Sequence, residues 1–307
     1  MTPSTQPAET LVARSDATVQ LLIDHPSVAV STARFSGRGP MSPQHAHAEH
    51  TEVFLVLDGA LRLVIASNET LAGAGTVVVV PPGVAHTFAT DGGARFLDLH
   101  APSRGYGAFL RALATAADED ERARARAAFD QHPAPAGGGG TDPASIAIVR
   151  TGGMDGEAIT DRPGRRVTLL ADTEHLTLSE FDYGPGQRGA SPHVHHDHSD
   201  VFLVVEGELE LTFESGPLRA TAGTFALVPP DVVHSFDNTS DASTRFFDIH
   251  APSCGFGDYL RGQNPGFDQH EPPPGGGIDP ANVVVRTFRT HEPRQSQATL
   301  WSLTCKS

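Results

Sequence analysis

Two histidines and a glutamate lie close together in the stretch His45-Ala-His-Ala-Glu-His-Thr-Glu52. Side chains at i and i+2 of an extended segment share a face, so we expect His45 and His47 to lie together and Glu52 to rejoin them through a kink or turn. A third histidine, His86, follows 39 residues after His47. Three imidazoles and a carboxylate suit a divalent transition metal, with one or two positions left for substrate, water or dioxygen.

The same constellation recurs at a constant offset of 148 residues, at His193, His195, Asp200 and His234. Residues 45–88 and 193–236 are identical at 21 of 44 positions, so the chain contains an internal duplication. Twelve of the 16 histidines form six matched pairs: His45/His193, His47/His195, His50/His198, His86/His234, His100/His250 and His132/His270. Each copy is predicted to bind one metal ion. Asp200 is one methylene shorter than Glu52, so the second site either binds through its three histidines or is degenerate.

A cluster without metal is the alternative for the first site, but it would leave buried polar groups hard to satisfy. His50 and His198 are interpreted as turn residues, and His196 as facing away from the pair that flanks it. His100 and His250, each two residues after an aspartate (Asp98 and Asp248), are expected to brace the strand exit. Four phenylalanines are interpreted as core residues that also suit a cavity wall: Phe54, Phe88, Phe202 and Phe236.

Length and charge limit the classes of protein. The 307 residues suffice for two domains, which we place at residues 1–148 and 149–307. The net charge of −15 argues against nucleic acid or an anionic membrane as a partner. The N-terminus has no basic start or apolar core, and no apolar run approaches 18 residues, so neither export nor membrane insertion is expected. Cys254 and Cys305 have no partners in the repeat, which fits a reducing cytoplasm.

Short strand-like runs fill both copies and predict an antiparallel β-sandwich or barrel. Asp58-Gly59 favours a tight hairpin turn between two such runs, and residues 1–10 are interpreted as a loose tail. Residues 107–129 are rich in Ala, Arg and Glu and predict a helix with Phe109, Leu110 and Leu113 on its apolar face. Its charged run, residues 118–126, is interpreted as a solvated face. A flexible glycine run, residues 136–140, follows before Asp142-Pro143 restarts the chain.

Both copies resemble the cupin superfamily. The first motif resembles Gly39-x5-His45-x-His47-x4-Glu52-x6-Gly59, and the second resembles Gly75-x5-Pro81-x-Gly83-x2-His86, with Thr90 where the family usually has Asn. The second copy departs at Gln187, Asp200 and Asp231. The resemblance implies an all-β protein of two tandem cupin barrels (double-stranded β-helix or jelly-roll) with short helical segments after each barrel.

Within the superfamily, the chain resembles two-domain (bicupin) proteins of the quercetin 2,3-dioxygenase, or quercetinase-like, family. The x4 spacing before Glu52, the duplication and the segment Leu99–Leu110 carry this resemblance. It implies a metal-dependent dioxygenase that opens a ring or cleaves an enolic, flavonol-type substrate with O2. The cofactor would be one divalent transition metal per domain, Fe or Mn first, with Ni, Co, Cu or Zn as alternatives. Glu52 would be both ligand and catalytic base.

Two other classes of function stay open: a metal-dependent isomerase, epimerase or decarboxylase acting on a small sugar or acid, and a non-enzymatic small-molecule-binding cupin. Residues 40–60 and 190–218 contain no Lys or Arg, which favours a neutral, aromatic substrate, although Arg62, Arg95 and Arg245 could reach a cavity.

The runs Val53–Leu57 and Val201–Val205 are apolar at every position, so we expect both faces of these strands to be covered. This predicts an intramolecular pseudo-dimer of the two domains, with a homodimer as a further alternative.

Overall fold

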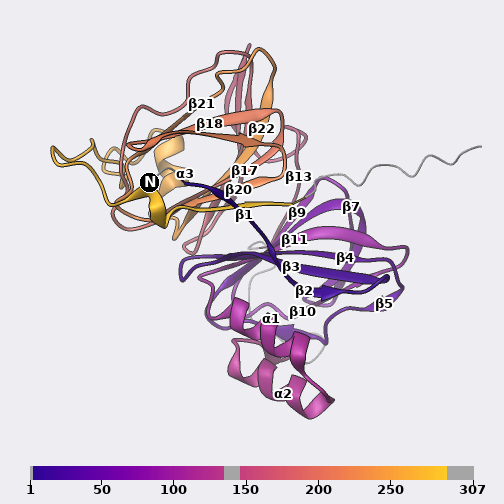
Figure 1. Ribbon diagram of the computed structural model, residues 1–307. Helices are drawn as coiled ribbons and strands as arrows, with labels where there is room; N and C mark the ends of the chain where they lie inside the picture. The colour runs from indigo at the N-terminus through magenta and orange to yellow at the C-terminus, as the bar shows by residue number, and fades with distance from the viewer. Residues whose placement is uncertain (1–2, 135–145, 289–307) are drawn as a thin grey trace, which may run out of the picture.

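The computed structural model describes residues 3–134 and 146–288. Strands dominate it, and each half of the chain forms two facing sheets, so that Figure 1 shows two barrels, one indigo to magenta and one orange to yellow. The all-β fold with two tandem cupin-like barrels is therefore confirmed. The predictions for residues 136–140, Asp142-Pro143 and Cys305 concern positions outside the described residues.

The first barrel is built around one long strand, β7, which takes part in both of its sheets and connects them into one network. One sheet contains β2 (Glu9–Ala13), β3 (Ala17–Asp24), β4 (Ala29–Phe35), β11 (Ala94–Ala101), the start of β7 (Thr51–Ile65), β9 (Thr76–Val80) and β13 (Ala147–Arg150). The other contains the end of β7, β8 (Asn68–Gly73), β10 (His86–Thr90), β5 (Gly39–Pro40), β6 (His45–Ala46) and β12 (His132–Pro133). Two helices, α1 (Tyr106–Thr115) and α2 (Glu119–Ala128), follow β11.

The second barrel repeats this plan. Its larger sheet has the order β1 (Thr5–Pro7), β23 (Val284–Thr287), β20 (Thr224–Val228), β17 (Ser199–Glu206), β22 (Thr244–Ala251), β16 (Thr177–Tyr183), β15 (Arg165–Asp172) and β14 (Glu157–Arg162). Its smaller sheet contains β19 (Gly216–Thr221), β18 (Glu208–Phe213) and β21 (His234–Asp237). A short helix, α3 (Phe256–Leu260), and a 3-10 turn at Pro280–Asn282 complete the described part. No described helix is long and apolar enough to span a bilayer.

The two domains share an apolar core, as the sequence predicts. Along β7, Val53 and Leu55 belong to a cluster that also includes Leu203 and Phe225 of the second domain. The alternate residue Phe54 faces the interior of its own barrel. Two hydrogen bonds frame this interface: Thr51 Oγ1 lies 3.0 Å from His175 Nδ1, and Ser27 Oγ donates to Ser199 Oγ at 2.9 Å. The pseudo-dimer therefore buries both faces of its central strands.

Asp58-Gly59 does not form a hairpin turn, so that prediction is wrong. β7 continues without a break through a corner at Gly59, from one sheet into the other, and Ala60 pairs with Gly73 of β8. Gly59 has a φ of 70°, and a Cβ there would clash with the carbonyl oxygen of Gly93. Positive φ serves a corner between sheets as well as a hairpin, so the dipeptide alone does not distinguish the two.

Two further expectations need correction. The N-terminal residues are not a loose tail where described, because Thr5–Pro7 pairs in parallel with β23 of the second domain and Glu9–Ala13 pairs with β3. The single predicted helix is two helices. Asp118 caps the N-terminus of α2, because its side chain accepts a hydrogen bond from the Glu121 backbone N–H at 2.8 Å. In return, the Glu121 side chain accepts a hydrogen bond from the Ala117 backbone N–H.

Candidate metal centre

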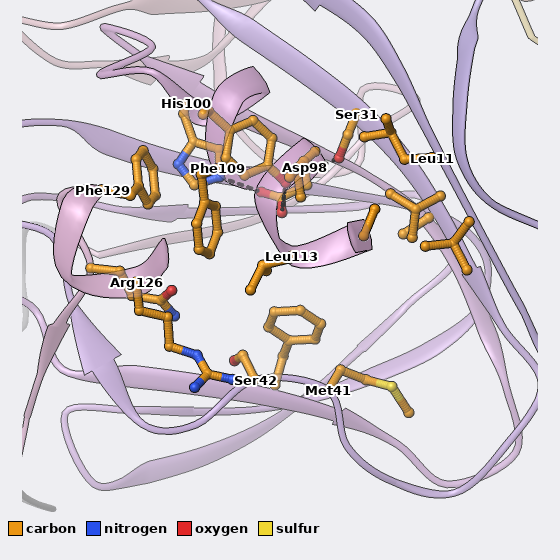
Figure 2. A pocket seen from close by; sticks show the side chains of 18 of the residues that line it. Leu11, Ser31, Met41, Ser42, Asp98, His100, Phe109, Leu113, Arg126 and Phe129 are labelled. Carbon is orange, nitrogen blue, oxygen red and sulfur yellow. Dashed lines mark hydrogen bonds and ion pairs between the residues drawn. The ribbon is translucent and has the colours of Figure 1, made fainter. Parts of the chain in front are cut away.

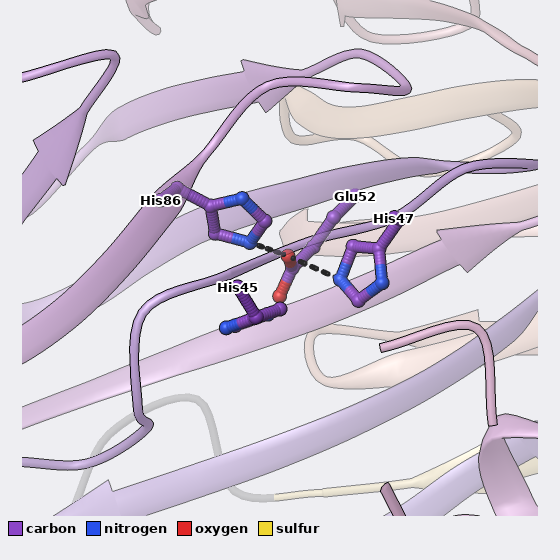
Figure 3. Close-up of side chains that lie close together, drawn as sticks. All are labelled: His45, His47, Glu52 and His86. Atoms are coloured by element: carbon purple, nitrogen blue, oxygen red, sulfur yellow. Dashed lines mark hydrogen bonds and ion pairs between the residues drawn. The ribbon is translucent and has the colours of Figure 1, made fainter. Parts of the chain in front are cut away.

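The four residues singled out in the first copy converge inside the first barrel (Figure 3). His45 starts β6 and pairs with His86 at the start of β10, while Glu52 near the start of β7 pairs with His100 of β11. The bend after His47 brings Glu52 back to the histidine face, as predicted. All four side chains are buried, and their ligand atoms lie within 4.8 Å of one another.

Backbone carbonyls fix the orientation of all three imidazoles. Nδ1 of His45 donates to the carbonyl of Pro43 at 2.8 Å, and Nδ1 of His86 donates to that of Val84 at 2.9 Å. Nδ1 of His47 donates to the carbonyl of Asp130 at 2.5 Å. Each Nε2 is thereby left for the centre of the site, and this is the outer support that metal-binding histidines require.

The donor set fits a divalent cation. Glu52 Oε2 lies 3.1 Å from Nε2 of His47 and 2.5 Å from Nε2 of His86. Nε2 of both rings and the Glu52 carboxylate therefore converge, as the ligands of a cation would. Three nitrogens and a carboxylate oxygen are the ligands of borderline transition metals.

The electrostatics of the metal-free site agree with an ionised carboxylate. Burial works to raise the pKa of Glu52, but His86, His47 and His100 outweigh it and hold that pKa well below its usual value. Burial and the neighbouring His86 lower the pKa of His45 to about 3, so this ring is neutral and able to coordinate. Burial also opposes protonation of His47, but its contacts with Glu52 raise its pKa overall.

The second copy forms the same arrangement with a shorter acid. His193, His195, Asp200 and His234 are all buried and close enough to hold an ion. Asp200 Oδ2 is 3.3 Å from Nε2 of His234 and 3.8 Å from that of His195. Burial and the adjacent Asp248 raise the pKa of Asp200 well above its usual value. Both contacts of the shorter Asp200 side chain are longer than those of Glu52 with its two histidines, so the acid of the second site lies farther from the histidine nitrogens.

A chain of buried polar residues supports the first site from outside. Asp130 Oδ2 accepts from His50 Nδ1 at 2.9 Å, and His50 Nε2 then accepts from His100 Nδ1 at 2.8 Å. The remaining His100 nitrogen lies 3.2 Å from Asp98 Oδ1, while Tyr106 donates its hydroxyl to Asp98 Oδ2 at 2.8 Å. The sequence predicts that His100 braces the strand exit; its contacts instead connect the candidate ligand cluster to His50 and Asp98. His50 is more than a turn residue, because it connects His100 to Asp130.

The second copy repeats most of this chain, through Asp268, His198, His250 and Asp248. It ends differently, since Phe256 occupies the place of Tyr106 and stacks on His250 with ring centres 3.5 Å apart. His196 lies apart from the ligand cluster, as predicted, and its Nδ1 is 2.6 Å from the Asp231 carboxylate at the surface.

Asp130 and Asp268 are functional residues that the sequence analysis missed. Each carboxylate accepts two backbone N–H bonds from the loop between the histidine pair and the acid, and each backbone carbonyl orients a ligand histidine. Their signal in the sequence is the repeated tetrapeptide Phe-Asp-Gln-His at residues 129–132 and 267–270. Both aspartates lie more than 70 residues from the loops they hold, so local spacing does not identify them.

A cavity of about 340 Å³ opens onto the first site, where His45, His47 and Glu52 form part of its wall. Most of the wall is apolar and aromatic: Phe35, Phe88, Phe96, Tyr106, Phe109, Leu110, Leu113 and Phe129. Figure 2 shows Phe109, Leu113 and Arg126 reaching this space from α1 and α2, which lie below the first barrel in Figure 1. Phe88 and, in the second domain, Phe236 are cavity walls, whereas Phe54 and Phe202 are core.

The basic residues of this cavity differ from those anticipated. Arg62, Arg95 and Arg245 are not among the described residues lining either cavity; Arg62 pairs with Asp91 at 3.1 Å. Arg14, Arg122 and Arg126 line the first cavity instead. None of the α2 residues is buried, so its charged run is a solvated face, as expected, from which Arg122 and Arg126 also reach the cavity. The second cavity, of about 320 Å³, contains His193, Asp200 and one arginine, Arg165, in its wall.

Comparisons with known proteins agree with this geometry. The cupin domain model matches twice, at residues 32–100 and 179–250. Quercetin 2,3-dioxygenase of Bacillus subtilis (strain 168) is 23% identical over 230 residues, 65% of this chain and 66% of that protein. An uncharacterized protein of Aquifex aeolicus (strain VF5) is 34% identical over 70 residues, 23% of this chain and 57% of that protein. The chain thus spans just under two thirds of the dioxygenase.

Solved structures support the fold alone, since their sequence identity is low. A cupin 2 conserved barrel domain protein from Leptotrichia buccalis covers 78% of this chain and 91% of its own, with a TM-score of 0.52 and 8% identity. Oxalate decarboxylase from Bacillus subtilis covers 82% and 78%, with a TM-score of 0.53 and 15% identity. These matches and the two barrels define a duplicated cupin fold. The chain thus contains two matches to the cupin domain, in a bicupin arrangement, and is similar to quercetin 2,3-dioxygenase.

Proposed function

We propose that this protein is a metal-dependent dioxygenase that opens a ring or cleaves an enolic, flavonol-type substrate with O2 in the cavity of its first domain. The observation that carries the proposal is the position of His45, His47, Glu52 and His86 beside an aromatic-walled cavity of about 340 Å³. This volume lies within the range of small-molecule sites. The similarity to quercetin 2,3-dioxygenase supports the type of reaction.

The four residues would hold one divalent ion, with Fe or Mn as the first candidates and Ni, Co, Cu or Zn as alternatives. Such an ion supplies a Lewis acid for a substrate oxygen. The outer hydrogen bonds to Pro43, Asp130 and Val84 keep each Nε2 directed inward. In the second domain, His193, His195, Asp200 and His234 would hold a second ion more weakly.

Glu52 has a second role in this proposal, as the base that takes the hydroxyl proton of the enol. It is buried, it forms part of the cavity wall and it is held as a carboxylate, so it is positioned to accept a proton from a bound substrate. The aromatic wall packs against a planar substrate and excludes water from the deprotonated enol. His100, 3.8 Å from Glu52 Oε1, acts as a positioning residue.

The proposal also covers the partners of the protein, its location and the boundary between its domains. The partners are a small aromatic or enolic substrate and O2, with neither nucleic acid nor a membrane involved, and the protein acts in the cytoplasm. The domain division at residues 148/149 stays a prediction. β13, at residues 147–150, belongs by its hydrogen bonds to the sheet of the first domain.

Oxygen uptake by metal-reconstituted protein tests the proposal. The full chain is stripped of metal, reloaded with Fe, Mn, Co, Ni, Cu or Zn, and assayed in an oxygen electrode with 3-hydroxyflavone, quercetin and acetylacetone. We expect stoichiometric oxygen consumption with at least one flavonol. Turnover that proceeds equally well without oxygen on a sugar or small acid would instead favour the isomerase, epimerase or decarboxylase, and binding of a small molecule without turnover would favour the non-enzymatic cupin.

A further inference from the structure

Two arginines on one face of α2 line the first cavity. Arg122 and Arg126 are four residues apart, a spacing that places both side chains on the same face of a helix. Their side chains are 41% and 25% exposed. Arg124 lies between them in sequence, is 70% exposed and is not a lining residue. α2 therefore presents two guanidinium groups to the cavity and a third to solvent.

The charged groups of this cavity are separated by sign. The carboxyl groups of Glu52 and Asp98 lie at the histidine cluster, where His86 and His100 contact them. The cations Arg122 and Arg126 lie on the helical side, and Arg14, the third arginine of the wall, is 67% exposed and lies 3.4 Å from Asp16. Figure 2 shows the Arg126 guanidinium near Ser42, with Leu113 between it and Asp98. A ligand in this space meets acids and the proposed metal at one end and cations at the other.

The present contacts of the two guanidinium groups are weak or lie with an exposed partner. Arg122 Nη2 donates to the Ala116 carbonyl at a long 3.4 Å. Arg126 Nη1 donates to Glu119 Oε1 at 2.6 Å, and Arg122 Nη1 is 3.8 Å from the other oxygen of Glu119. Glu119 is 70% exposed, and ion pairs with an exposed carboxylate are weak. A ligand anion in the less hydrated cavity therefore competes well for these arginines, whose planar groups suit carboxylate geometry.

The arrangement is specific to the first domain. Among the described residues 146–288, the short helix α3 is the only α-helix after β22, so α2 and its arginines have no counterpart there. Arg165 lines the second cavity, and its guanidinium carbon lies 5.0 Å from the centre of the Tyr183 ring. The duplication has thus produced two different cavities around similar histidine clusters.

We infer that the substrate of the first site is an aromatic acid, with an enol or hydroxyl end facing Glu52 and a carboxylate or comparable anion facing Arg122 and Arg126. This inference deepens the proposed function and rests on its placing of the substrate in the first cavity. It replaces the neutral substrate favoured by the absence of Lys and Arg near the histidine motifs.

Binding of a matched ligand pair tests the inference. The full metal-loaded chain is titrated without oxygen with 3-hydroxyflavone and with its 4′-carboxylate, and oxygen uptake is measured separately on both. We expect the carboxylate to bind more tightly by on the order of 10-fold, as for hydrogen bonds to a charged group. The difference in affinity between the two ligands should decrease as the salt concentration is raised. The preference for the carboxylate should disappear in the double variant Arg122→Gln/Arg126→Gln.

Arg124→Gln is the matched control, because it removes a charge from the same helix outside the cavity and should retain the full advantage of the carboxylate. Gln is a good helix former, and thermal melting checks that α2 variants stay folded. Equal binding of both ligands to the wild type, with oxygen uptake on the neutral flavonol, would overturn this inference and leave the proposed function standing. An advantage that survives in the double variant would overturn it as well. If neither ligand binds and neither supports oxygen uptake, both this inference and the proposed function are overturned.

Discussion

Oε2 of Glu52 lies 2.5 Å from Nε2 of His86, whereas the same contact in the second domain, between Asp200 and His234, measures 3.3 Å. Because Asp200 is the shorter acid, the second cluster is looser. The pKa of Asp200 is raised, whereas that of Glu52 is lowered. The duplication has therefore preserved the histidines of both sites while changing the length of the acid and its distance from them.

From this difference, we predict that one equivalent of Mn added to metal-free protein occupies the first site. His86→Ala should weaken binding of this equivalent by at least roughly 10- to 100-fold, the cost of losing even an outer support of a metal site. His234→Ala, the matched change in the second domain, should leave it bound. Metal analysis after equilibrium dialysis measures both variants. Equal losses in both variants would contradict the ranking of the sites.

The shared core predicts that the first domain does not behave well alone. A chain of residues 1–150 would expose Val53, Leu55 and their neighbours, which pack against the second domain in the intact molecule. It would also leave β1 without its partner β23. We expect self-association or aggregation in size-exclusion chromatography with light scattering. A compact monomer that stays soluble at increasing concentration would contradict this interface.

The contact between Thr51 and His175 predicts a pH effect on stability. Burial lowers the pKa of His175 from its usual 6.5, so below that pH the unfolded chain takes up a proton that the folded protein resists. The contribution of His175 to the free energy of unfolding is therefore fully present above about pH 6.5 and is lost as the pH falls. His175→Gln should flatten the decline in unfolding free energy between pH 7.5 and 5 by a fraction of one proton. His132→Gln, at an exposed position, is the control; an unchanged slope in His175→Gln would refute the assignment.

Gly59 predicts a large local cost of adding one methyl group. Gly59→Ala forces a positive φ on alanine and a clash with the Gly93 carbonyl, so we expect a loss of roughly 2 kcal/mol or more in unfolding free energy. Gly73 in β8 has open space around its Cα, and Gly73→Ala should change stability by less than about 0.5 kcal/mol. Denaturant unfolding compares the two. Similar midpoints would mean that Gly59 is not a strained corner.

The clustering of the candidate ligands could be predicted from sequence because the relevant information is local or duplicated. The i and i+2 spacing of His45 and His47 defines a shared face, and the repeat confirms which later residues belong with them. The apolar run around Val53 likewise predicts a strand that is buried on both faces. Each of these inferences needs only strand geometry and a matched second copy.

The predictions that failed concern features that tertiary contacts determine. Asp130 holds a loop about 80 residues away, a contact that no local pattern reveals. A charged helix such as α2 has the same composition whether its arginines meet solvent or a cavity, and only its packing beside the barrel places Arg122 and Arg126. Gly59 satisfies the rule for a hairpin, but the register of β7 with β8 and β11 makes it a corner.

The central claim is that Glu52 is both ligand and base, and one paired measurement tests it most directly. Oxygen uptake and metal content are determined on the same samples of wild type, Glu52→Gln and Asp200→Asn across pH. At full metal occupancy, Glu52→Gln should lose roughly 10²- to 10⁴-fold in turnover, because an amide can coordinate but cannot accept the substrate proton. Asp200→Asn should leave turnover nearly unchanged. Wild-type activity per bound metal in Glu52→Gln would contradict the account.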